Sequence, residues 1–426
     1  MARLPRHASE TLIRVSPMLP GTTIRDRRCS MSGMYGTLFL LAFCVAWVGH
    51  ACIWVSLLNN FYGRPLPKWL LKPWRLMTGL VILAFPLILL SGINPKWWAW
   101  VERSDVILNG FWERVIAGYA GLCLLLGSVG FPAITVARLL RKTPASVAAQ
   151  STRTLDLWAD YGHKLHGDGH FAWVTRLPGN CVFQVDFTDL TLALPDLPRE
   201  WEGLSILMLS DLHFHGTPAR PYFERIVDEL IAGEVPDLVC LIGDYVDTKT
   251  HHAWIQPILG RLTAKEGKFA ILGNHDWYQD PDQVRADLAA AGYTVLGNGW
   301  CEETIRGVKC ILVGHEGPWF RPGPDLTTAP AEGFRLCLSH TPDNFYWGLA
   351  NQVRLMLCGH VHGGQIRVPV VGSIFVPSIY GRRFDRGIFE KNGSVMVVSR
   401  GVSGKEPLRF RCHPQVVRIR LVNKKS

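Results

Sequence analysis

The chain has 426 residues, of which 48% are hydrophobic and 19% are charged, and its formal net charge is +10. A composition this apolar excludes general disorder, and the length allows two or three folded units. The charge is uneven, since residues 1–142 carry a net +11 and residues 143–426 a net −1. A nucleic-acid-binding protein concentrates positive charge on its folded module, so this distribution argues against nucleic acid as a partner.

Residues 1–34 form a basic tail, and residues 35–142 have the pattern of a membrane region. Three apolar stretches, at residues 35–58, 76–93 and 115–137, contain no Asp, Glu, Lys or Arg. Each is close to or above the ~18–20 residues that cross a bilayer as a helix, and tryptophans gather near their ends, at the level of the headgroups. We therefore predict three transmembrane helices. Buried helices of a soluble domain are the alternative, but such helices usually show a polar stripe.

The basic residues that flank these stretches bear on the orientation of the chain in the membrane. The tail and the second loop hold nine Lys and Arg, against seven in the first loop and after the third stretch, which barely decides the orientation. If translation starts at Met31 or Met34, the balance becomes three against seven and the globular part lies in the cytoplasm. The globular part has an odd number of cysteines and no C-x-x-C pair, which also favours a reducing compartment. A twin-arginine export signal at Arg27 and Arg28 is the competing interpretation, but its flanking residues fit poorly and two more spans follow.

Residues 143–184 are polar and contain several glycines, and we predict that they form a linker to a globular domain at residues 185–426. Within the linker, His163 and His166 have a spacing that can bind a metal. A solvated loop is the alternative, because no further ligands lie near them in the sequence.

The globular region alternates short apolar runs with helical patterns. The runs predict strands at residues 205–209, 238–242, 269–272, 310–313, 335–338 and 355–357. Helical patterns cover residues 222–231 and 281–291, and Asp280 can cap the second of these helices. Asn392 and Gly393, between two further apolar runs, predict a hairpin. Such an alternation indicates a layered α/β fold.

Side chains that can bind metals follow five of the predicted strands. They are Asp211, His213, Asp244, Asn274, His340, His360 and His362. Because the carboxyl ends of strands in an α/β fold meet at one rim, these residues should converge in space. The set is too large for one divalent ion and suits two ions that share a carboxylate. A lone histidine or a single Asp-x-His arises by chance, whereas five such pieces in order indicate a site.

Glycines directly precede three of these candidate ligands. Gly243, Gly273 and Gly359 stand where the chain leaves a predicted strand. Because glycine has no Cβ, the chain can turn sharply at these points and leave room for an ion or a phosphate oxygen.

The segments S-D-L-H, G-D-Y-V-D, G-N-H-D, S-H-T-P and G-H-V-H-G-G-Q resemble the motifs of the calcineurin-like metallophosphoesterase superfamily. The G-H-x-H-G-G-Q form resembles its branch of membrane-associated bacterial phosphodiesterases. The resemblance covers about residues 185–422 and excludes the predicted spans. It implies a two-sheet αββα sandwich after the three transmembrane helices, and two divalent ions drawn from Mn, Fe, Zn and Mg.

The resemblance also implies a role for each candidate residue. It places the first metal on Asp211, His213 and His362, the second on Asn274, His340 and His360, and Asp244 as the bridge between them. His275 would assist the leaving group as the catalytic histidine, with Asp276 as its orienting partner.

A dinuclear-metal hydrolase of phosphate esters is therefore the expected function, most simply a phosphodiesterase or pyrophosphatase. Attachment to a membrane favours a lipid-linked substrate, such as one resembling UDP-2,3-diacylglucosamine, and membrane lipids as partners. The bacterial inner membrane, with the catalytic domain cytoplasmic, is the expected location. A membrane-anchored scaffold or sensor without catalysis is one alternative, and a phosphomonoesterase or protein phosphatase is another. The sequence leaves the oligomeric state open.

Overall fold

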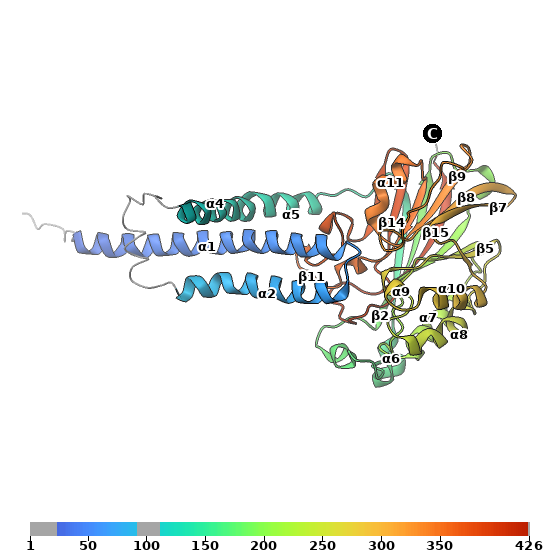
Figure 1. Cartoon of the computed structure of the whole chain (residues 1–426), viewed down its shortest axis with the longest axis horizontal. Coiled ribbons are helices and arrows are strands. Elements are labelled where there is room, and N and C mark those ends of the chain that lie inside the picture. Colours follow the sequence, from blue (N-terminus) through green and yellow to red (C-terminus); the bar gives the residue numbers. More distant parts are fainter. Residues whose placement is uncertain (1–23, 92–110, 425–426) are drawn as a thin grey trace, which may run out of the picture.

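Three apolar helical segments lead into the globular part of the chain (Figure 1). The computed structural model describes residues 24–91 and 111–424. The helical segments are α1 (Ile24–Tyr62), α2 (Lys68–Ser91), and a third segment made of α4 (Phe111–Leu125), the π-helical turn η1 (Leu126–Gly130) and α5 (Phe131–Leu139). Three stretches are long and apolar enough to cross a membrane, namely Gly36–Tyr62, Lys68–Leu87 and Ala117–Leu139.

These stretches overlap the three predicted spans. The second helix begins eight residues earlier than predicted, at Lys68, because the basic and aromatic residues before residue 76 continue the helix. The end of that predicted span, at residues 92–93, lies outside the described residues, as do residues 1–23 of the basic tail and the second loop up to residue 110.

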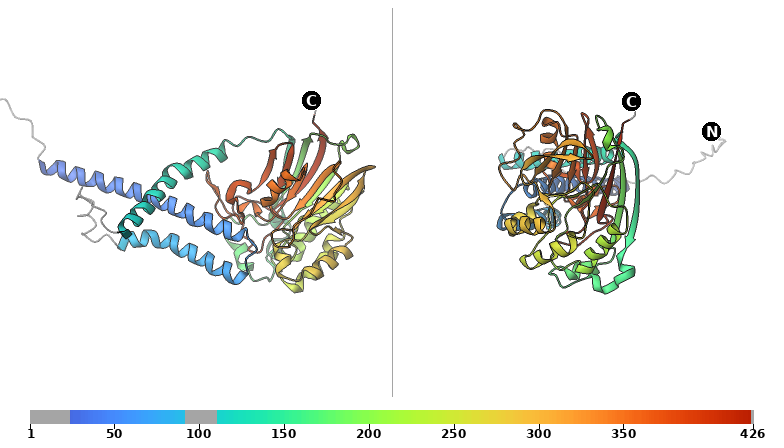
Figure 2. Two further views of the ribbon diagram at one scale, coloured as in Figure 1. Left: turned by 45° about the horizontal axis from the view of Figure 1, so that its top comes forward. Right: turned by 90° about the vertical axis from the view of Figure 1, so that its right-hand side faces the viewer.

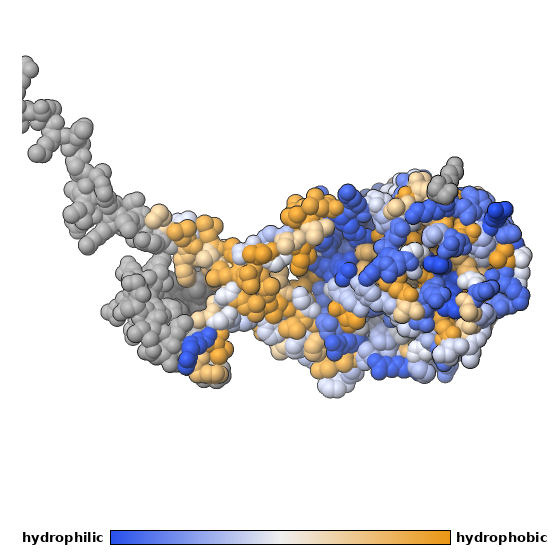
Figure 3. Space-filling model, turned by 90° about the horizontal axis from the view of Figure 1, so that it is seen from above, coloured by the Kyte–Doolittle hydropathy of each residue, from blue (hydrophilic) through white to orange (hydrophobic). Residues whose placement is uncertain are grey.

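The outer surface of the helical bundle is apolar, in contrast to the globular part (Figure 3). Leu38, Leu83 and Val129, one from each segment, expose 55%, 59% and 57% of their surface. A continuous exposed apolar surface is costly in water and marks contact with lipid or another protein. The bundle therefore has the surface that a bilayer requires.

Close backbone contacts hold the bundle together. A Cβ added to Gly127 in η1 would lie 1.9 Å from the carbonyl oxygen of Val45, and one added to Gly49 would lie 1.8 Å from that of Cys123. Small residues allow membrane helices to approach in this way. Inside the bundle, Nδ1 of His50 lies 2.6 Å from the hydroxyl of Tyr119.

The first sheet of the globular part has seven strands in the order β1-β2-β15-β3-β4-β5-β6. Strands β3 to β6 run parallel to one another, which brings their carboxyl ends to one edge. The strands are β1 (Val147–Asp156), β2 (Gln184–Leu194), β3 (Ser205–Leu209), β4 (Leu238–Leu241), β5 (Gly267–Ala270), β6 (Thr294–Val295) and β15 (Gln415–Asn423).

The second sheet has six strands in the order β13-β14-β10-β9-β8-β7. Strand β14 pairs antiparallel with β13 around Asn392 and Gly393, which confirms the predicted hairpin. The strands are β7 (Gly299–Ile305), β8 (Val308–His315), β9 (Phe334–Ser339), β10 (Leu355–Cys358), β13 (Gly387–Lys391) and β14 (Ser394–Val398). A separate small hairpin joins β11 (Arg367–Val368) and β12 (Gly372–Ser373).

Helices cover the outer faces of the two sheets, as the αββα prediction requires (Figure 2). On β3, Leu207 and Leu209 pack with residues of the covering helices, whereas Ile206 and Met208 pack between the sheets. This alternation follows from the opposite directions of successive side chains in a strand. The helices are α6 (Leu157–Tyr161), α7 (Arg220–Ile231), α8 (Ile255–Leu259), α9 (Asn274–Tyr278), α10 (Pro281–Ala290) and α11 (Phe345–Ala350).

The segment predicted as a linker is largely folded. Strand β1 of this segment pairs antiparallel with β2 and forms the edge of the first sheet. Its residues are mostly exposed, so the strand shows no apolar alternation in the sequence, and backbone hydrogen bonds hold it in place. A hydrogen bond from the backbone of Trp158 to the Asp156 side chain then caps α6.

Direct contacts join the helical bundle to the globular part. Near the end of α1, the Asn59 side chain accepts a hydrogen bond from the Val376 backbone (3.0 Å) and donates to the carbonyl of Ile374 (3.3 Å). At the end of α5, Arg138 forms an ion pair of 2.8 Å with buried Asp385. The two parts therefore meet through specific polar contacts at both ends of this junction.

Candidate metal centre

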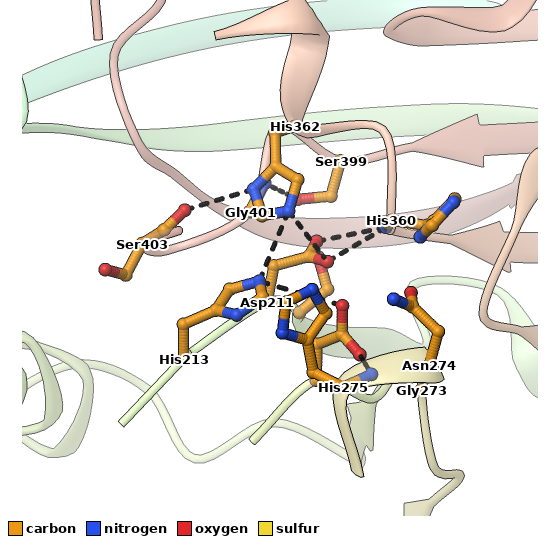
Figure 4. Close-up of polar contacts among 12 residues, drawn as sticks. Asp211, His213, Gly273, Asn274, His275, His360, His362, Ser399, Gly401 and Ser403 are labelled. Atoms are coloured by element: carbon orange, nitrogen blue, oxygen red, sulfur yellow. Dashed lines mark hydrogen bonds and ion pairs between the residues drawn. The ribbon is translucent and has the colours of Figure 1, made fainter. Parts of the chain in front are cut away.

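The loops that follow β3, β4, β5, β9 and β10 bring all seven predicted metal ligands together. Figure 4 labels Asp211, His213, Asn274, His360 and His362 among them. Most of these side chains are buried; Asp211 and His340 are fully inaccessible and His362 is the most exposed. Residues separated by up to 151 positions in the sequence therefore share one small volume, because their strands end at the same edge of the two sheets.

The ligand atoms form two groups that share Asp244. The side chains of Asp211, His213, Asp244 and His362 place one potential ligand atom each within 4.8 Å of the others. Asp244 also forms such a group with His340 and His360, and Oδ1 of Asn274 lies 3.0 Å from Nε2 of His340. A carboxylate common to two groups has the position of a bridging ligand.

Two buried atoms of this cluster have no hydrogen-bond partner among the described residues. They are Oδ2 of Asp244 and Nε2 of His360. Buried polar atoms are almost always paired, and each unpaired atom costs about 1–3 kcal/mol. Divalent ions held by this set of imidazole, carboxylate and amide ligands would satisfy both atoms, so the residues present fit the metals that the resemblance implies.

Most of the ligands have a backbone conformation that is rare outside glycine. The φ angles of Asp211, His213, Asp244, His360 and His362 are 57°, 51°, 59°, 69° and 49°. The left-handed region costs a residue with a Cβ about 1–2 kcal/mol. Strain of this kind concentrates at functional sites, where the surrounding fold maintains it.

Hydrogen bonds behind the imidazoles fix their orientation. Nδ1 of His340 lies 2.8 Å from the carbonyl oxygen of Ile242, and Nδ1 of His213 lies 3.1 Å from Oδ2 of Asp247. Because these acceptors take the proton on Nδ1, Nε2 is the atom of each ring that faces the cluster and can bind a metal. This arrangement is usual for histidines that bind metals.

Burial also sets the charge of the cluster. It lowers the pKa of His360 and of His362 well below the usual value, so both imidazoles are neutral near pH 7. Burial by itself would raise the pKa of Asp244, but the imidazoles of His340 and His275 outweigh it and hold that pKa well below the usual range. Neutral histidine and ionised aspartate are the forms that bind metal ions, and His360, His362 and Asp244 have them. His340 differs, because burial alone would lower its pKa but the Asp244 carboxylate outweighs burial and raises the pKa of His340 to about 9.

Glycine is needed where the loops approach one another. A Cβ on Gly273 would lie 2.2 Å from Oδ1 of Asp244, and one on Gly243 would lie 2.8 Å from Nδ1 of His340. Gly243 also has a φ of 87°. The predicted space beside the ligands is therefore present, and a side chain at position 243 or 273 would fill it.

His275 has a different carboxylate partner from the predicted one. Its Nδ1 contacts Oδ1 of Asp247, whose other oxygen contacts His213. The carboxylate of Asp276 instead accepts hydrogen bonds from backbone amides, those of Gly273 and Asp244 at 2.8 and 2.9 Å among them. Asp276 thus fastens the loops after β4 and β5 together, and the expectation that it orients His275 is wrong.

Asp247 was within reach of sequence reasoning, because it ends the G-D-Y-V-D segment. The helix α9, which begins at Asn274, turns the His275 ring toward the Asp247 carboxylate and the Asp276 carboxylate toward the backbone amides of that segment. Adjacent residues on a helix point in directions about 100° apart, so their neighbours differ.

Other histidines singled out by the sequence do not join the cluster. Nδ1 of His163 lies 3.4 Å from Nε2 of His166, and His166 also contacts Thr175. Among the described residues, neither belongs to a group of three potential ligands. The solvated-loop interpretation therefore needs one change, since His166 is a buried, hydrogen-bonded residue of that segment.

A cavity opens onto the cluster and is bounded by both parts of the molecule. Residues of the cluster and residues near the α1–α2 connection both line it. The first group is His213, Asp244, Asn274, His275, His360 and His362. The second group is Tyr62, Arg64, Lys68, Leu71, Lys72 and Arg75. The sequence offered no sign of this contact, because the two segments are about 200 residues apart.

Comparison with known proteins agrees with this geometry. Residues 204–364 match the family described as calcineurin-like phosphoesterase. The chain is 30% identical over 245 residues to the uncharacterized metallophosphoesterase YkuE of Bacillus subtilis, covering 54% of this chain and 84% of that protein. It is 33% identical over 225 residues to the phosphodiesterase YaeI of Escherichia coli, covering 51% of this chain and 82% of that protein.

A third relative is described as a transmembrane protein with a metallophosphoesterase domain, from Danio rerio. It is 26% identical over 196 residues, which cover 42% of this chain and 44% of that protein. The αββα fold, the shared cluster of histidine and aspartate ligands and these relatives together lead to one conclusion. The chain belongs to the calcineurin-like metallophosphoesterases, phosphoric ester hydrolases that use divalent metals.

Proposed function

We propose that this protein uses two divalent ions to hydrolyse a phosphodiester or diphosphate bond of a lipid or lipid-linked substrate. The observation that carries the proposal is the cavity that is lined both by the metal cluster and by the end of the helical bundle that meets the globular domain. A phosphate group in this cavity lies beside the segment from which α2 enters its candidate membrane span. The name of the Escherichia coli relative, a phosphodiesterase, supports the choice of bond.

The size of the cavity also favours a lipid headgroup over a whole lipid. Its volume is about 200 Å³, below the ~300–1,000 Å³ of pockets that enclose drug-sized ligands. The scissile phosphate and its nearest substituents fit inside, and the acyl chains must lie outside. A substrate resembling UDP-2,3-diacylglucosamine meets this requirement.

The residue roles follow from the two groups that share Asp244. Asp211, His213 and His362 would hold one ion and Asn274, His340 and His360 the other, with Asp244 between them. When bound, the ions supply charge that holds phosphoryl oxygens and lowers the pKa of a water nucleophile. Nε2 of His275 would donate a proton to the departing oxygen, because Asp247 holds its Nδ1 and keeps the ring protonated.

The protein would act in the bacterial inner membrane with its catalytic domain in the cytoplasm. The α1–α2 connection and the end of α5 lie at the same end of the bundle as the domain (Figure 1). If translation starts at Met31 or Met34, seven Lys and Arg flank the spans at that end against three at the other, and cytoplasmic flanks carry an excess of these residues.

Metal-dependent turnover by the purified full chain tests the proposed function. Wild-type protein loaded with Mn²⁺ should hydrolyse bis(p-nitrophenyl) phosphate faster than p-nitrophenyl phosphate and lose activity in EDTA. Asp244→Asn should lose both ions by metal analysis and nearly all turnover, because a bridging ligand serves both sites. An unchanged metal content in this variant would contradict the bridge. Absence of any metal-dependent turnover by the wild type would favour a scaffold or sensor, and a preference for the monoester would favour a phosphatase.

A further inference from the structure

The part of the cavity wall that the α1–α2 connection and Lys405 form is strongly basic, and we call it the basic wall. Arg64, Lys68 and Lys72, near the start of α2, line the cavity together with Lys405. Within the described part of the chain, none of these four side chains forms an ion pair with a carboxylate. Arg75, which also lines the cavity, differs because it pairs with Glu406 at 2.9 Å.

One of these cations, Lys68, and the backbone before it contact the catalytic helix. Nζ of Lys68 lies 4.0 Å from the centre of the Tyr278 ring, and Tyr278 is the last residue of α9. The Tyr278 hydroxyl donates a hydrogen bond to the carbonyl of Leu66. The start of α2 is therefore attached to the helix that carries Asn274 and His275.

Contacts at the end of α1 fix the α1–α2 connection to the globular part as well. A Cβ on Gly63 would lie 2.7 Å from the backbone nitrogen of Ile379. The rings of Tyr62 and Phe375 meet edge to face with their centres 5.2 Å apart. The backbone that carries Arg64 and Lys68 is thus fixed against the globular part, which keeps these cations at the cavity.

The charge of the wall exceeds what one phosphodiester needs. A phosphodiester carries one negative charge, and the two ions would balance it together with the aspartates of the cluster. Four further cations without carboxylate partners favour a second anionic group at the opposite side of the same cavity.

This inference rests on the proposed function and deepens it. We propose that Arg64, Lys68, Lys72 and Lys405 form a second phosphate site, so that the substrate is a membrane lipid with two phosphate groups, one bound by the metals and one by the start of α2. The membrane helices then supply substrate-binding residues in addition to attachment. Lys68 and Lys72 contact the second phosphate, and Lys68 is positioned for this by Tyr278.

A comparison of lipids with one and two phosphates tests the proposal. The full chain in mixed micelles is assayed with CDP-diacylglycerol, which has two phosphates, and phosphatidylglycerol, which has one. Soluble UDP-N-acetylglucosamine shows whether two phosphates suffice without a lipid. The double variant K68Q/K72Q should reduce the ratio of kcat/KM for the two lipids by about 10- to 100-fold, as expected for lost charged hydrogen bonds.

The control is Lys309→Gln, which removes a lysine that is 74% exposed and pairs with Glu302 on the β7–β8 hairpin. It should keep the wild-type ratio. If the double variant does not fold, the single variant Lys72→Gln replaces it, since that side chain is exposed.

The outcomes separate the inference from the proposed function. An unchanged ratio in the lysine variants overturns the second phosphate site, even when metal-dependent turnover is present. Equal turnover of UDP-N-acetylglucosamine and the two-phosphate lipid supports the phosphate site and overturns the lipid part of the proposal. If no substrate is turned over, the proposed function fails, and equilibrium binding of the same two lipids to wild type and K68Q/K72Q decides the site.

Discussion

Asp247 and Asp276 lie close together beside the metal ligands, but their carboxylates serve different neighbours. Asp247 contacts the imidazoles of His213 and His275. Asp276 accepts hydrogen bonds from the backbone amides of Gly273, Asp244, Tyr245 and Val246. Substitution of Asp247 should therefore disturb imidazole orientation, whereas substitution of Asp276 should disturb the loops that carry the ligands.

Asp276→Asn should lower stability and metal affinity together. The amide keeps one acceptor oxygen and directs its NH₂ group at backbone donors, and each buried donor left unsatisfied costs about 1–3 kcal/mol. Thermal unfolding and metal titration measure the two effects. His275→Ala is the comparison, because it should keep the metal content and the melting temperature while turnover falls by about 10²–10⁴ on a substrate with a poor leaving group. A stable, metal-replete Asp276→Asn protein would contradict the structural role.

The site could be predicted from the sequence wherever one residue carries its own signal. All seven ligands follow apolar runs, and each run became a strand within about two residues of the predicted bounds. The partner of His275 could not be predicted in this way, because it depends on how α9 is rotated. The basic wall at Lys68 could not be predicted either, since it depends on how the bundle docks on the domain.

At the scale of elements, the same distinction separates the predicted strands from β1. Strand β3 is buried on both faces, and its uninterrupted apolar run is a strong signal. Strand β1 lies at the sheet edge with mostly exposed side chains, so its polar sequence resembles a linker. The Asp280 cap was predicted correctly because capping depends on a short local pattern, and its side chain accepts a hydrogen bond from Gln283.

The contact between α1 and η1 leads to a prediction about the helical bundle. Gly127→Val would place a side chain against the backbone of Val45, where a Cβ alone would come within 1.9 Å. The helices must separate, and overpacking of this kind costs about 1–3 kcal/mol. Thermal unfolding of the detergent-solubilised chain should show a lower melting temperature. Gly121→Val in α4 is the matched control, because no atom lies within 4 Å of a Cβ there. Equal losses in the two variants would refute the close contact.

At the scale of the whole molecule, the ends of α1 and α2 lie against the globular part near α9 (Figure 1), and one cavity there is lined both by metal ligands and by basic residues of the helical bundle. The net charge of +10 is therefore the sum of regions of opposite charge that lie at different places in the fold. Residues 143–366, which carry a net charge of −11, contribute all seven predicted metal ligands. Basic residues near the start of α2, together with Lys405, line the same cavity.

Fusion of reporters to the chain tests the proposed orientation. Green fluorescent protein at the C-terminus should fluoresce, because it folds in the cytoplasm. Alkaline phosphatase at the same position should be inactive, because it needs export. Fusions that end in the second loop, near residue 100, should give the reverse pattern. An active C-terminal alkaline phosphatase would place the domain outside the cytoplasm.

The hydrogen bond from the Tyr278 hydroxyl to the Leu66 carbonyl has a mechanical consequence. It links a catalytic helix to a turn between two spans, and spans tilt to match the thickness of the surrounding bilayer. We expect turnover of bis(p-nitrophenyl) phosphate to vary with acyl-chain length in phosphatidylcholine vesicles and to pass through a maximum. Tyr278→Phe, which removes the hydroxyl, should flatten this profile, and a flat wild-type profile would refute the link. The enzyme would then sense the thickness of the membrane that holds its substrate.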